Sequence, residues 1–163
     1  MRELILLRHA HADALATGQT DAERPLSAEG RSEALAAALW LQQQGMTPDR
    51  ILVSPSARTR ETADAVIAEF AKHGVDSIER REEAAMYEAS SGELAGLADQ
   101  NRDAGRLLMV GHNPGFEQLA ALMHSGQSGD YRGMPPGGIA VLRLPADAAI
   151  EPGIASLVAF WWP

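Results

Sequence analysis

The sequence predicts an α/β fold: a three-layer sandwich in which helices cover both faces of a mostly parallel central sheet. Short aliphatic runs alternate along the chain with longer segments whose apolar residues recur at helical spacing. Three of the aliphatic runs end abruptly in polar residues, at the points where parallel strands would expose their carboxyl ends. The chain has 163 residues, of which 45% are hydrophobic, and this predicts a single domain over residues 1–163.

The first strand is expected at Leu4–Leu7, an uninterrupted aliphatic run that delivers Arg8 and His9 to its carboxyl end. A polar loop over 11–25 follows and contains little apolar material. A helix is expected over Ser27–Gln44, with its first residue as the N-cap, because apolar residues recur there every three or four positions.

The second strand is expected at Arg50–Ser54, which is again aliphatic in its centre. Ser54 and Pro55 then predict an N-cap followed by proline at the first helical position. The helix runs to about Lys72 and places Arg58 in its first turn, close to the end of the preceding strand. A basic residue therefore again lies at a strand-to-helix junction.

The clear strand Arg106–Gly111 forms the third junction, because His112 and Asn113 follow it directly and a helix is expected over 114–124. The patterns around it are weaker. They predict a weak strand over 75–80, an irregular acidic stretch over 82–90, a short helix over 92–101, a loop rich in glycine and proline over 125–138, a strand over 139–144, a turn at 145–147 and a last, antiparallel strand over 155–162 at or near a sheet edge.

The composition excludes several classes of protein. With 22 acidic and 14 basic residues the formal net charge is -8, which argues against a nucleic-acid or membrane-surface partner. The absence of cysteine excludes disulfides, thiolate metal sites and cysteine nucleophiles. The first aliphatic run is too short for a signal peptide or for the roughly 20 residues of a membrane span, so a cytoplasmic location is expected.

The three junctions predict one common site. If the three strands lie side by side and parallel, Arg8, His9, Arg58 and His112 converge in one crevice. Guanidinium groups, imidazoles and helix amino ends together suit a dianion such as a phosphoryl group. A neutral imidazole can attack phosphorus as a nucleophile, and the positive groups can stabilise the equatorial oxygens without a metal or another cofactor.

These junctions carry motifs of a known family. Arg8-His9-Ala10 resembles the signature of the histidine phosphatase superfamily, which includes phosphoglycerate mutases and acid phosphatases, with Ala10 where glycine is commoner. The segment Ser54–Arg58 with Thr62-Ala63 resembles its second motif, and Val110–Asn113 resembles its third. The resemblance covers nearly the whole chain in order and spacing, and it implies a phosphoglycerate mutase-like fold.

Within the superfamily the chain is most similar to the SixA branch, the small bacterial protein-histidine phosphatases. The similarity includes the short length and the segments Arg8–Ala12, Arg24–Ser27 with Gly30, and Met86–Ala89. It implies roles for seven residues. His9 would be the nucleophile, Arg8, Arg58 and His112 the phosphate pocket, Arg24 and Asn113 further substrate contacts, and Glu88 the match to a proton-donating glutamate that SixA-like proteins often lack.

The resemblance implies metal-independent hydrolysis of phosphohistidine on a signalling or carrier protein, through a phosphohistidine intermediate on His9 and with inorganic phosphate as product. Three alternatives stay open: a phosphatase or mutase for a small phosphate ester, a phosphate-binding module without chemistry, and a metal-dependent hydrolase using His9, His11 and Asp13. The loops 11–24 and 125–138 are expected to set specificity. The second loop contains three polar residues that either border the pocket or face solvent: Asp130, Tyr131 and Arg132.

Overall fold

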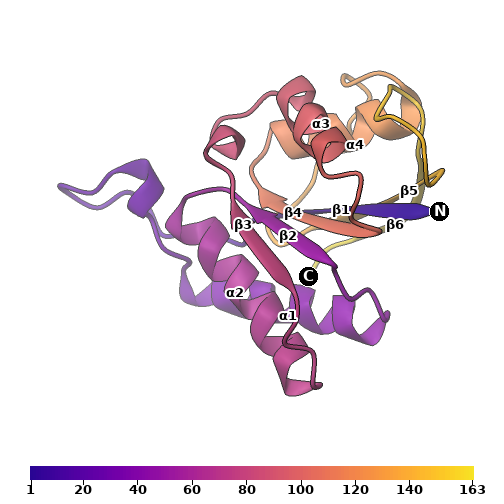
Figure 1. Cartoon of the computed structure of the whole chain (residues 1–163). Coiled ribbons are helices and arrows are strands. Elements are labelled where there is room, and N and C mark those ends of the chain that lie inside the picture. The colour runs from indigo at the N-terminus through magenta and orange to yellow at the C-terminus, as the bar shows by residue number, and fades with distance from the viewer.

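A six-stranded mixed sheet lies between two pairs of helices in the computed structural model, which describes residues 1–163 (Figure 1). Five strands point the same way and β5 alone runs antiparallel to them, in the order β3-β2-β4-β1-β5-β6. The strands are β1 (Arg2–Arg8), β2 (Arg50–Val53), β3 (Glu79–Glu82), β4 (Arg106–Gly111), β5 (Ile139–Leu144) and β6 (Ser156–Trp161). The predicted three-layer, mostly parallel α/β fold is therefore confirmed.

Four α-helices and two single-turn 3-10 helices connect the strands. They are α1 (Ala28–Gln43), α2 (Ala57–Lys72), α3 (Ser91–Gln100), α4 (Gly115–Ser125), η1 (Asp21–Glu23) and η2 (Ala84–Met86). As Figure 1 shows, α1 and α2 cover one face of the sheet, and α3 and α4 cover the other. None of these helices has the length and apolar character needed to cross a membrane.

The central strand β1 explains why both faces are covered. Its four aliphatic residues are at most 2% exposed, and alternate side chains point to opposite faces of a strand. Ile5 and Leu7 pack in a core with α1 and α2, whereas Leu4 and Leu6 pack in a core with α3 and α4. A continuous aliphatic run is therefore what a strand buried on both sides requires.

The start of α2 differs from the prediction. Its N-cap is Ser56, whose hydroxyl accepts a hydrogen bond from the backbone N–H of Thr59, and the prediction of Ser54 as the cap with Pro55 as the first helical residue is wrong. The physical reason is that Ser54 still belongs to the sheet: its backbone N–H donates to the carbonyl of Val110 at 3.1 Å. The helix therefore begins two residues later, which leaves the Ser54 side chain free for another partner.

The weak strand expected over 75–80 lies at Glu79–Glu82 instead, as the edge strand β3. Val75 closes the end of α2 by donating its backbone N–H to the carbonyl of Phe70, and its side chain packs against the core. The aliphatic residues of this segment thus cover the core, and a strand of four charged residues forms the edge. Charged edge strands resist pairing with other chains.

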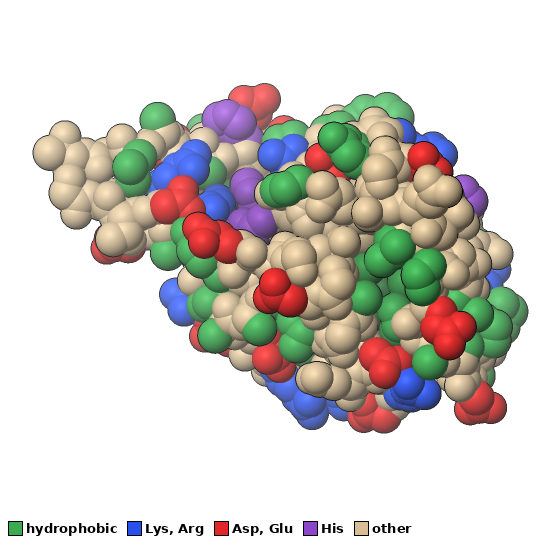
Figure 2. All heavy atoms as spheres, turned by 90° about the horizontal axis from the view of Figure 1, so that it is seen from above, with side chains coloured by type: hydrophobic (Ala, Val, Ile, Leu, Met, Phe, Trp, Pro, Cys, Tyr) green, Lys and Arg blue, Asp and Glu red, His purple; other side chains and the backbone are tan.

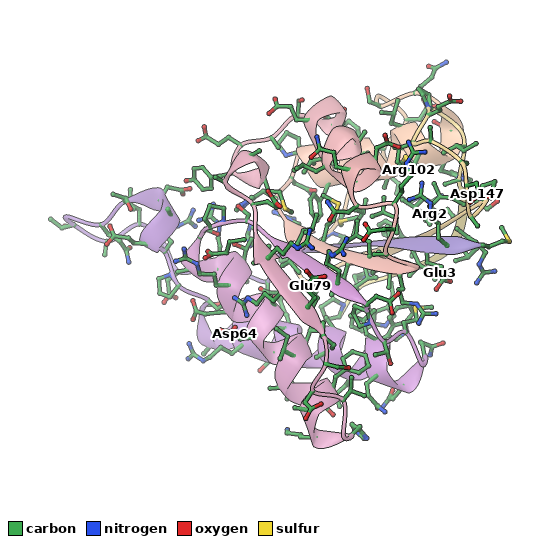
Figure 3. The ribbon with its side chains drawn as sticks, viewed as in Figure 1. Arg2, Glu3, Asp64, Glu79, Arg102 and Asp147 are labelled. Carbon is green, nitrogen blue, oxygen red and sulfur yellow. The ribbon has the colours of Figure 1, made fainter.

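Charged side chains pair with one another at the end of the sheet where β1 and β4 begin. Glu3, labelled in Figure 3, accepts hydrogen bonds from Arg106 at 2.7 Å and from Arg143 at 3.0 Å. Arg2, at the same end of β1, donates to the carbonyl of Ala148 at 2.5 Å. In Figures 1 and 3 this end of β1 lies on the opposite side of the molecule from a projecting segment, residues 11–25, which follows the carboxyl end of the strand.

Candidate active site

His9 follows β1 directly, and its ring has a defined tautomer. Its Nδ1 lies 2.7 Å from the carbonyl oxygen of Ala10, and because a carbonyl only accepts, Nδ1 carries the proton. The other nitrogen, Nε2, then keeps its lone pair. Burial, reinforced by the nearby positive charges of Arg58 and Arg8, lowers the pKa of His9 to about 3, against the weaker opposing effect of the Ala10 hydrogen bond. The ring is therefore neutral near pH 7.

His112 follows the neighbouring strand β4 and faces His9. The ring centroids are 5.3 Å apart, with an angle of 59° between the ring planes. His112 Nε2 lies 2.7 Å from Oγ of Ser54, and Nδ1 lies 3.5 Å from Nη2 of Arg58. Because a guanidinium only donates, Nδ1 is the acceptor and Nε2 carries the proton. Burial and the charge of Arg58 lower the pKa of His112 to about 4, so this ring is neutral as well.

Two glycines allow α4 to pack closely against the end of β4 and against the segment that precedes α3. A Cβ at Gly111 would lie 2.6 Å from the ring of Phe116, and a Cβ at Gly115 would lie 2.6 Å from the carbonyl oxygen of Ala89. Gly111 thus lets α4 start next to His112. Gly115 lets the segment that leads into α3 lie against the first turn of α4, where it forms a wall of the pocket.

Arg58 projects from the first turn of α2 and is only 6% exposed. It is held by one residue of the projecting segment: Nη1 donates to the backbone carbonyl of Asp21 at 2.8 Å, and Nη2 donates to its Oδ2 at 2.9 Å. The Asp21 carboxylate also accepts hydrogen bonds from the hydroxyl of Tyr87 and from Nη1 of Arg24. These hydrogen bonds from Tyr87, Arg24 and Arg58 hold the pKa of Asp21 well below its usual range, so it is ionised.

The side chains enclose an open pocket of about 440 Å³ at the carboxyl ends of the parallel strands. In Figure 2, histidine, basic and acidic side chains gather where the projecting segment joins the body of the molecule. Thirteen residues line the pocket: His9, Asp21, Arg58, Tyr87, Glu88, Ala89, Ser90, Glu93, His112, Asn113, Pro114, Gly115 and Gln118.

Five of the predicted site residues are thus brought together: His9, Arg58, Glu88, His112 and Asn113. Among them Glu88 has an exposed side chain and a left-handed backbone, with φ of 59°. Asn113 also lines the pocket, but its Nδ2 donates to Oε2 of Glu117 at 3.1 Å and to the carbonyl of Met134 at 3.0 Å.

Arg8 and Arg24, the other two predicted residues, do not line the pocket. Nη1 of Arg8 donates to the carbonyl of Met134 at 2.8 Å, while its buried Nε has no partner. Arg24 donates from Nε to the carbonyl of Asp13 at 2.9 Å and reaches the pocket only through Asp21. In this structure Arg8 therefore holds the 125–138 loop and Arg24 holds the projecting segment.

Sequence reasoning missed three polar residues of the site: Asp21, Ser54 and Tyr87. Asp21 and Tyr87 lie in segments without secondary-structure patterns, so no spacing rule connects them with Arg58. Ser54 is the exception, because the predicted convergence of strand ends places it beside His112, as the structure shows. In the sequence Ser54 is interpreted as a helix cap and as part of the second family motif, without a role at the site.

The ligands of the metal-dependent alternative do not gather. His11 turns to the start of α1, where its Nδ1 lies 2.7 Å from Oγ of Ser27, whereas His9 Nδ1 binds Ala10. No group of three or more histidines, aspartates or glutamates in the chain is placed to hold a metal ion. Asp130, Tyr131 and Arg132 line a different, smaller cavity of about 40 Å³ between α4 and β6.

A mixed sheet with two facing histidines and an arginine at the carboxyl ends of its strands defines a phosphoglycerate mutase-like α/β protein. Residues 4–123 match the model of the histidine phosphatase superfamily (branch 1), and the chain belongs to this family.

Two sequence relatives match most of this chain. An uncharacterized chloroplastic protein of Arabidopsis thaliana is 34% identical over 128 residues, which cover 75% of this chain and 59% of that protein. The chain thus spans less than two thirds of the plant protein. An uncharacterized protein of Picosynechococcus is 33% identical over 148 residues, which cover 86% of this chain and 84% of that protein.

The solved structures that the chain resembles include two from the SixA group. A candidate phosphohistidine phosphatase SixA of Agrobacterium tumefaciens has a TM-score of 0.82 and 30% identity, with 99% of this chain and 98% of that one covered. Its counterpart from Nakamurella multipartitia has a TM-score of 0.82 and 28% identity, with coverages of 99% and 96%.

Proposed function

We propose that this protein is a metal-independent phosphatase that removes the phosphoryl group from phosphohistidine on a signalling or carrier protein. The observation that carries the proposal is the state of His9. Its ring is neutral, Nδ1 is fixed as a donor to Ala10, and Nε2 keeps a lone pair beside Arg58 and His112. A neutral nitrogen nucleophile next to fixed positive charge suits attack on phosphorus.

In the first step the lone pair of His9 Nε2 forms a bond to phosphorus. The bond from phosphorus to the substrate breaks, and its electron pair stays on the leaving nitrogen. Arg58, which lines the same pocket as His9, stabilises the charge on the phosphoryl oxygens. In the second step water attacks the phosphoryl group on His9, the new P–N bond breaks, and inorganic phosphate leaves while the His9 ring returns to its neutral form.

The state of Asp21 favours a nitrogen leaving group. An alkoxide needs a proton as it leaves, but the Asp21 carboxylate is ionised and has no proton to give. A phosphohistidine ring that is protonated on its second nitrogen leaves as neutral imidazole and needs no acid. The similarity to the two SixA structures supports this substrate class.

The openness of the pocket supports a protein substrate. Glu88, Ser90 and Glu93, on one wall, are exposed to solvent. A phosphorylated side chain on a protein surface can therefore enter, with the projecting segment 11–25 beside it (Figure 1). The match covers 59% of the plant relative, so that protein contains further segments outside the match. The partner proposed for this chain is a protein that carries phosphohistidine.

The test is phosphate release, in the presence of a chelator, from a histidine-phosphorylated carrier protein and from a phosphoserine peptide. Wild type, His9→Ala and the control His124→Ala, which removes an exposed histidine of α4, are compared. We expect release from the histidine substrate, abolished only in His9→Ala. Release that survives His9→Ala refutes the nucleophile, and release from phosphoserine alone refutes the substrate class in favour of a small-ester phosphatase.

A further inference from the structure

We propose that Asp21 makes this pocket select a leaving group that carries positive charge, as a protonated phosphohistidine ring does, against the alkoxide leaving group of a phosphate ester. This inference rests on the proposed function and specifies what distinguishes its substrates. Asp21 acts here as a fixed negative charge, whereas a proton donor would have to be a neutral acid.

The first support is the position of Asp21 on Arg58. Asp21 uses two of the five N–H donors of this guanidinium, at 2.8 and 2.9 Å, a third points to Nδ1 of His112 at 3.5 Å, and the remaining two stay available for phosphoryl oxygens. Any phosphoryl group held by Arg58 therefore lies close to a carboxylate. The free energy of binding then depends on the charge that the substrate brings with its phosphoryl group.

The second support is that Asp21 cannot easily turn away. Its Oδ1 is held by Arg24 at 3.0 Å, and its Oδ2 by Tyr87 and Arg58. The single turn that begins at Asp21 is closed by hydrogen bonds between the backbone and side chain of Thr20 and the carboxylate of Glu23, both 2.8 Å. A carboxylate has about four acceptor positions, so three donors leave one for an N–H of the substrate.

The third support is the charge balance of the lining. Arg58 is the only lysine or arginine among the thirteen lining residues, and both histidines are neutral. Three carboxylates oppose it, and we call them the acidic wall: Asp21, Glu88 and Glu93. The floor of the pocket thus suits an anion, while the wall around it disfavours a substrate that carries further negative charge.

The chemistry of the leaving group explains the selection. A phosphohistidine ring protonated on its second nitrogen is positive before the P–N bond breaks and neutral afterwards, and the N–H can bind the free acceptor position of Asp21. In a phosphate ester the P–O electron pair makes the leaving oxygen more negative as the bond breaks. The Asp21 carboxylate therefore raises the activation free energy for cleavage of the P–O bond of the ester and lowers it for cleavage of the P–N bond of phosphohistidine.

The experiment compares kcat/KM for a phosphohistidine peptide and a matched phosphoserine peptide in wild type and Asp21→Asn. The asparagine keeps an oxygen that can accept from Arg58 and Tyr87 but removes the charge. We expect the ratio of kcat/KM for phosphohistidine to kcat/KM for phosphoserine to fall about five- to tenfold in Asp21→Asn. This is the range expected for removal of a charge that, like the Asp21 side chain, is about half exposed. The inhibition constant of inorganic phosphate should fall by a similar factor, because the anion no longer faces Asp21.

Two further variants secure the interpretation. Asp76→Asn removes an exposed carboxylate in the turn before β3, at the other end of the strands, and should change neither quantity. Glu88→Gln removes another charge of the acidic wall without touching the hydrogen bonds of Arg58, and should shift both in the same direction by a smaller factor. Glu88→Gln therefore tests the effect of the acidic wall on substrate preference even if Asp21→Asn does not fold.

The outcomes separate this inference from the proposed function. Suppose that phosphohistidine is still hydrolysed and that the ratio of the two kcat/KM values is unchanged in both acidic-wall variants. This result leaves the proposed function standing and refutes only the inference about Asp21. Weaker binding of inorganic phosphate by Asp21→Asn also refutes it, because it shows that Asp21 serves only to position Arg58. A wild-type protein that hydrolyses phosphoserine faster than phosphohistidine refutes both the proposed function and the inference.

Discussion

Nη1 of Arg8 donates a hydrogen bond to the carbonyl oxygen of Met134 at 2.8 Å, across 126 positions of the chain. Asn113 donates to the same carbonyl at 3.0 Å. A residue that directly precedes the candidate nucleophile therefore helps to fix the 125–138 loop, which is rich in glycine and proline. This arrangement leads to the first of four predictions.

Replacing Arg8 with alanine should loosen the part of this loop before residue 135. Residues 137 and 138 stay attached, because their backbone groups bond those of Arg8 and His9. Amide hydrogen exchange should therefore become faster in Arg8→Ala for the residues just before Met134 only. Arg143→Ala, which removes an exposed arginine of β5, should leave the loop unchanged. Equal exchange in wild type and Arg8→Ala would refute this role of the hydrogen bond.

The neutral state of His9 should make the protein less stable in acid. Its pKa is about 3 when folded and about 6.5 in the unfolded chain, so the unfolded state binds more protons between these values. The stability that His9 contributes is complete above pH 6.5 and is lost as the pH falls toward 3. At pH 5 the loss is about 2 kcal/mol.

The measurement is urea unfolding at pH 7 and pH 5, followed for wild type and His9→Gln. Glutamine does not titrate, so the variant should lose about 2 kcal/mol less than wild type between the two pH values. Carboxylates such as Asp21 also weaken folding in acid, but they do so in both proteins. An identical pH dependence in the two proteins would show that His9 titrates normally in the folded state.

Removing the hydroxyl of Ser54 should release His112 from its fixed orientation. Ser54 is fully buried and accepts the Nε2 proton of His112, so Ser54→Ala leaves that donor without its partner. We expect a loss of about 1 kcal/mol of stability and of about tenfold in kcat/KM. The ¹⁵N chemical shifts of the ring should show a mixture of tautomers. Ser156→Ala, at an exposed position of β6, serves as the control, and an unchanged tautomer would contradict the assignment.

A methyl group at Gly115 should displace the pocket wall. Its Cβ would lie 2.6 Å from the carbonyl oxygen of Ala89, a backbone atom that cannot move alone. Gly115→Ala should therefore cost about 1–3 kcal/mol of stability and reduce turnover. Gly96→Ala in α3 meets no atom within 4 Å and should instead stabilise the protein by about 0.5–1 kcal/mol. Thermal unfolding and kcat/KM of both variants test the contrast.

The parts of the fold that the sequence predicted well are those decided by local composition. The runs at Leu4–Leu7 and Arg106–Gly111 are aliphatic throughout their centres, and only a strand buried on both faces needs such a run. Where two such strands end, parallel pairing brings their next residues together, and for this reason His9 and His112 could be placed in one pocket. Their chemical roles stay predictions.

The parts that it missed depend on contacts between distant segments. Ser54 resembles a helix cap, and only its pairing with Val110 shows that the strand continues through it. Asp21 lies in a polar loop, and nothing in its neighbours indicates that it binds Arg58, 37 positions later. Arg8 binds the carbonyl of Met134 in the loop that ends near Gly138, a contact that the sequence does not indicate, while its role at the phosphate stays a prediction. Local sequence patterns carry no information on these contacts between residues that are far apart in the chain.

The register of the sheet has a consequence for how relatives of this protein can diverge. Arg8 lies opposite Gly111 in the pairing of β1 with β4, so His9 and His112 leave the two innermost strands at the same level. The spacing of the two rings is set by backbone hydrogen bonds in the best-protected part of the molecule. Insertions or deletions in the 11–25 segment or the 125–138 loop can therefore change the surface around the pocket without changing the distance between the two imidazoles.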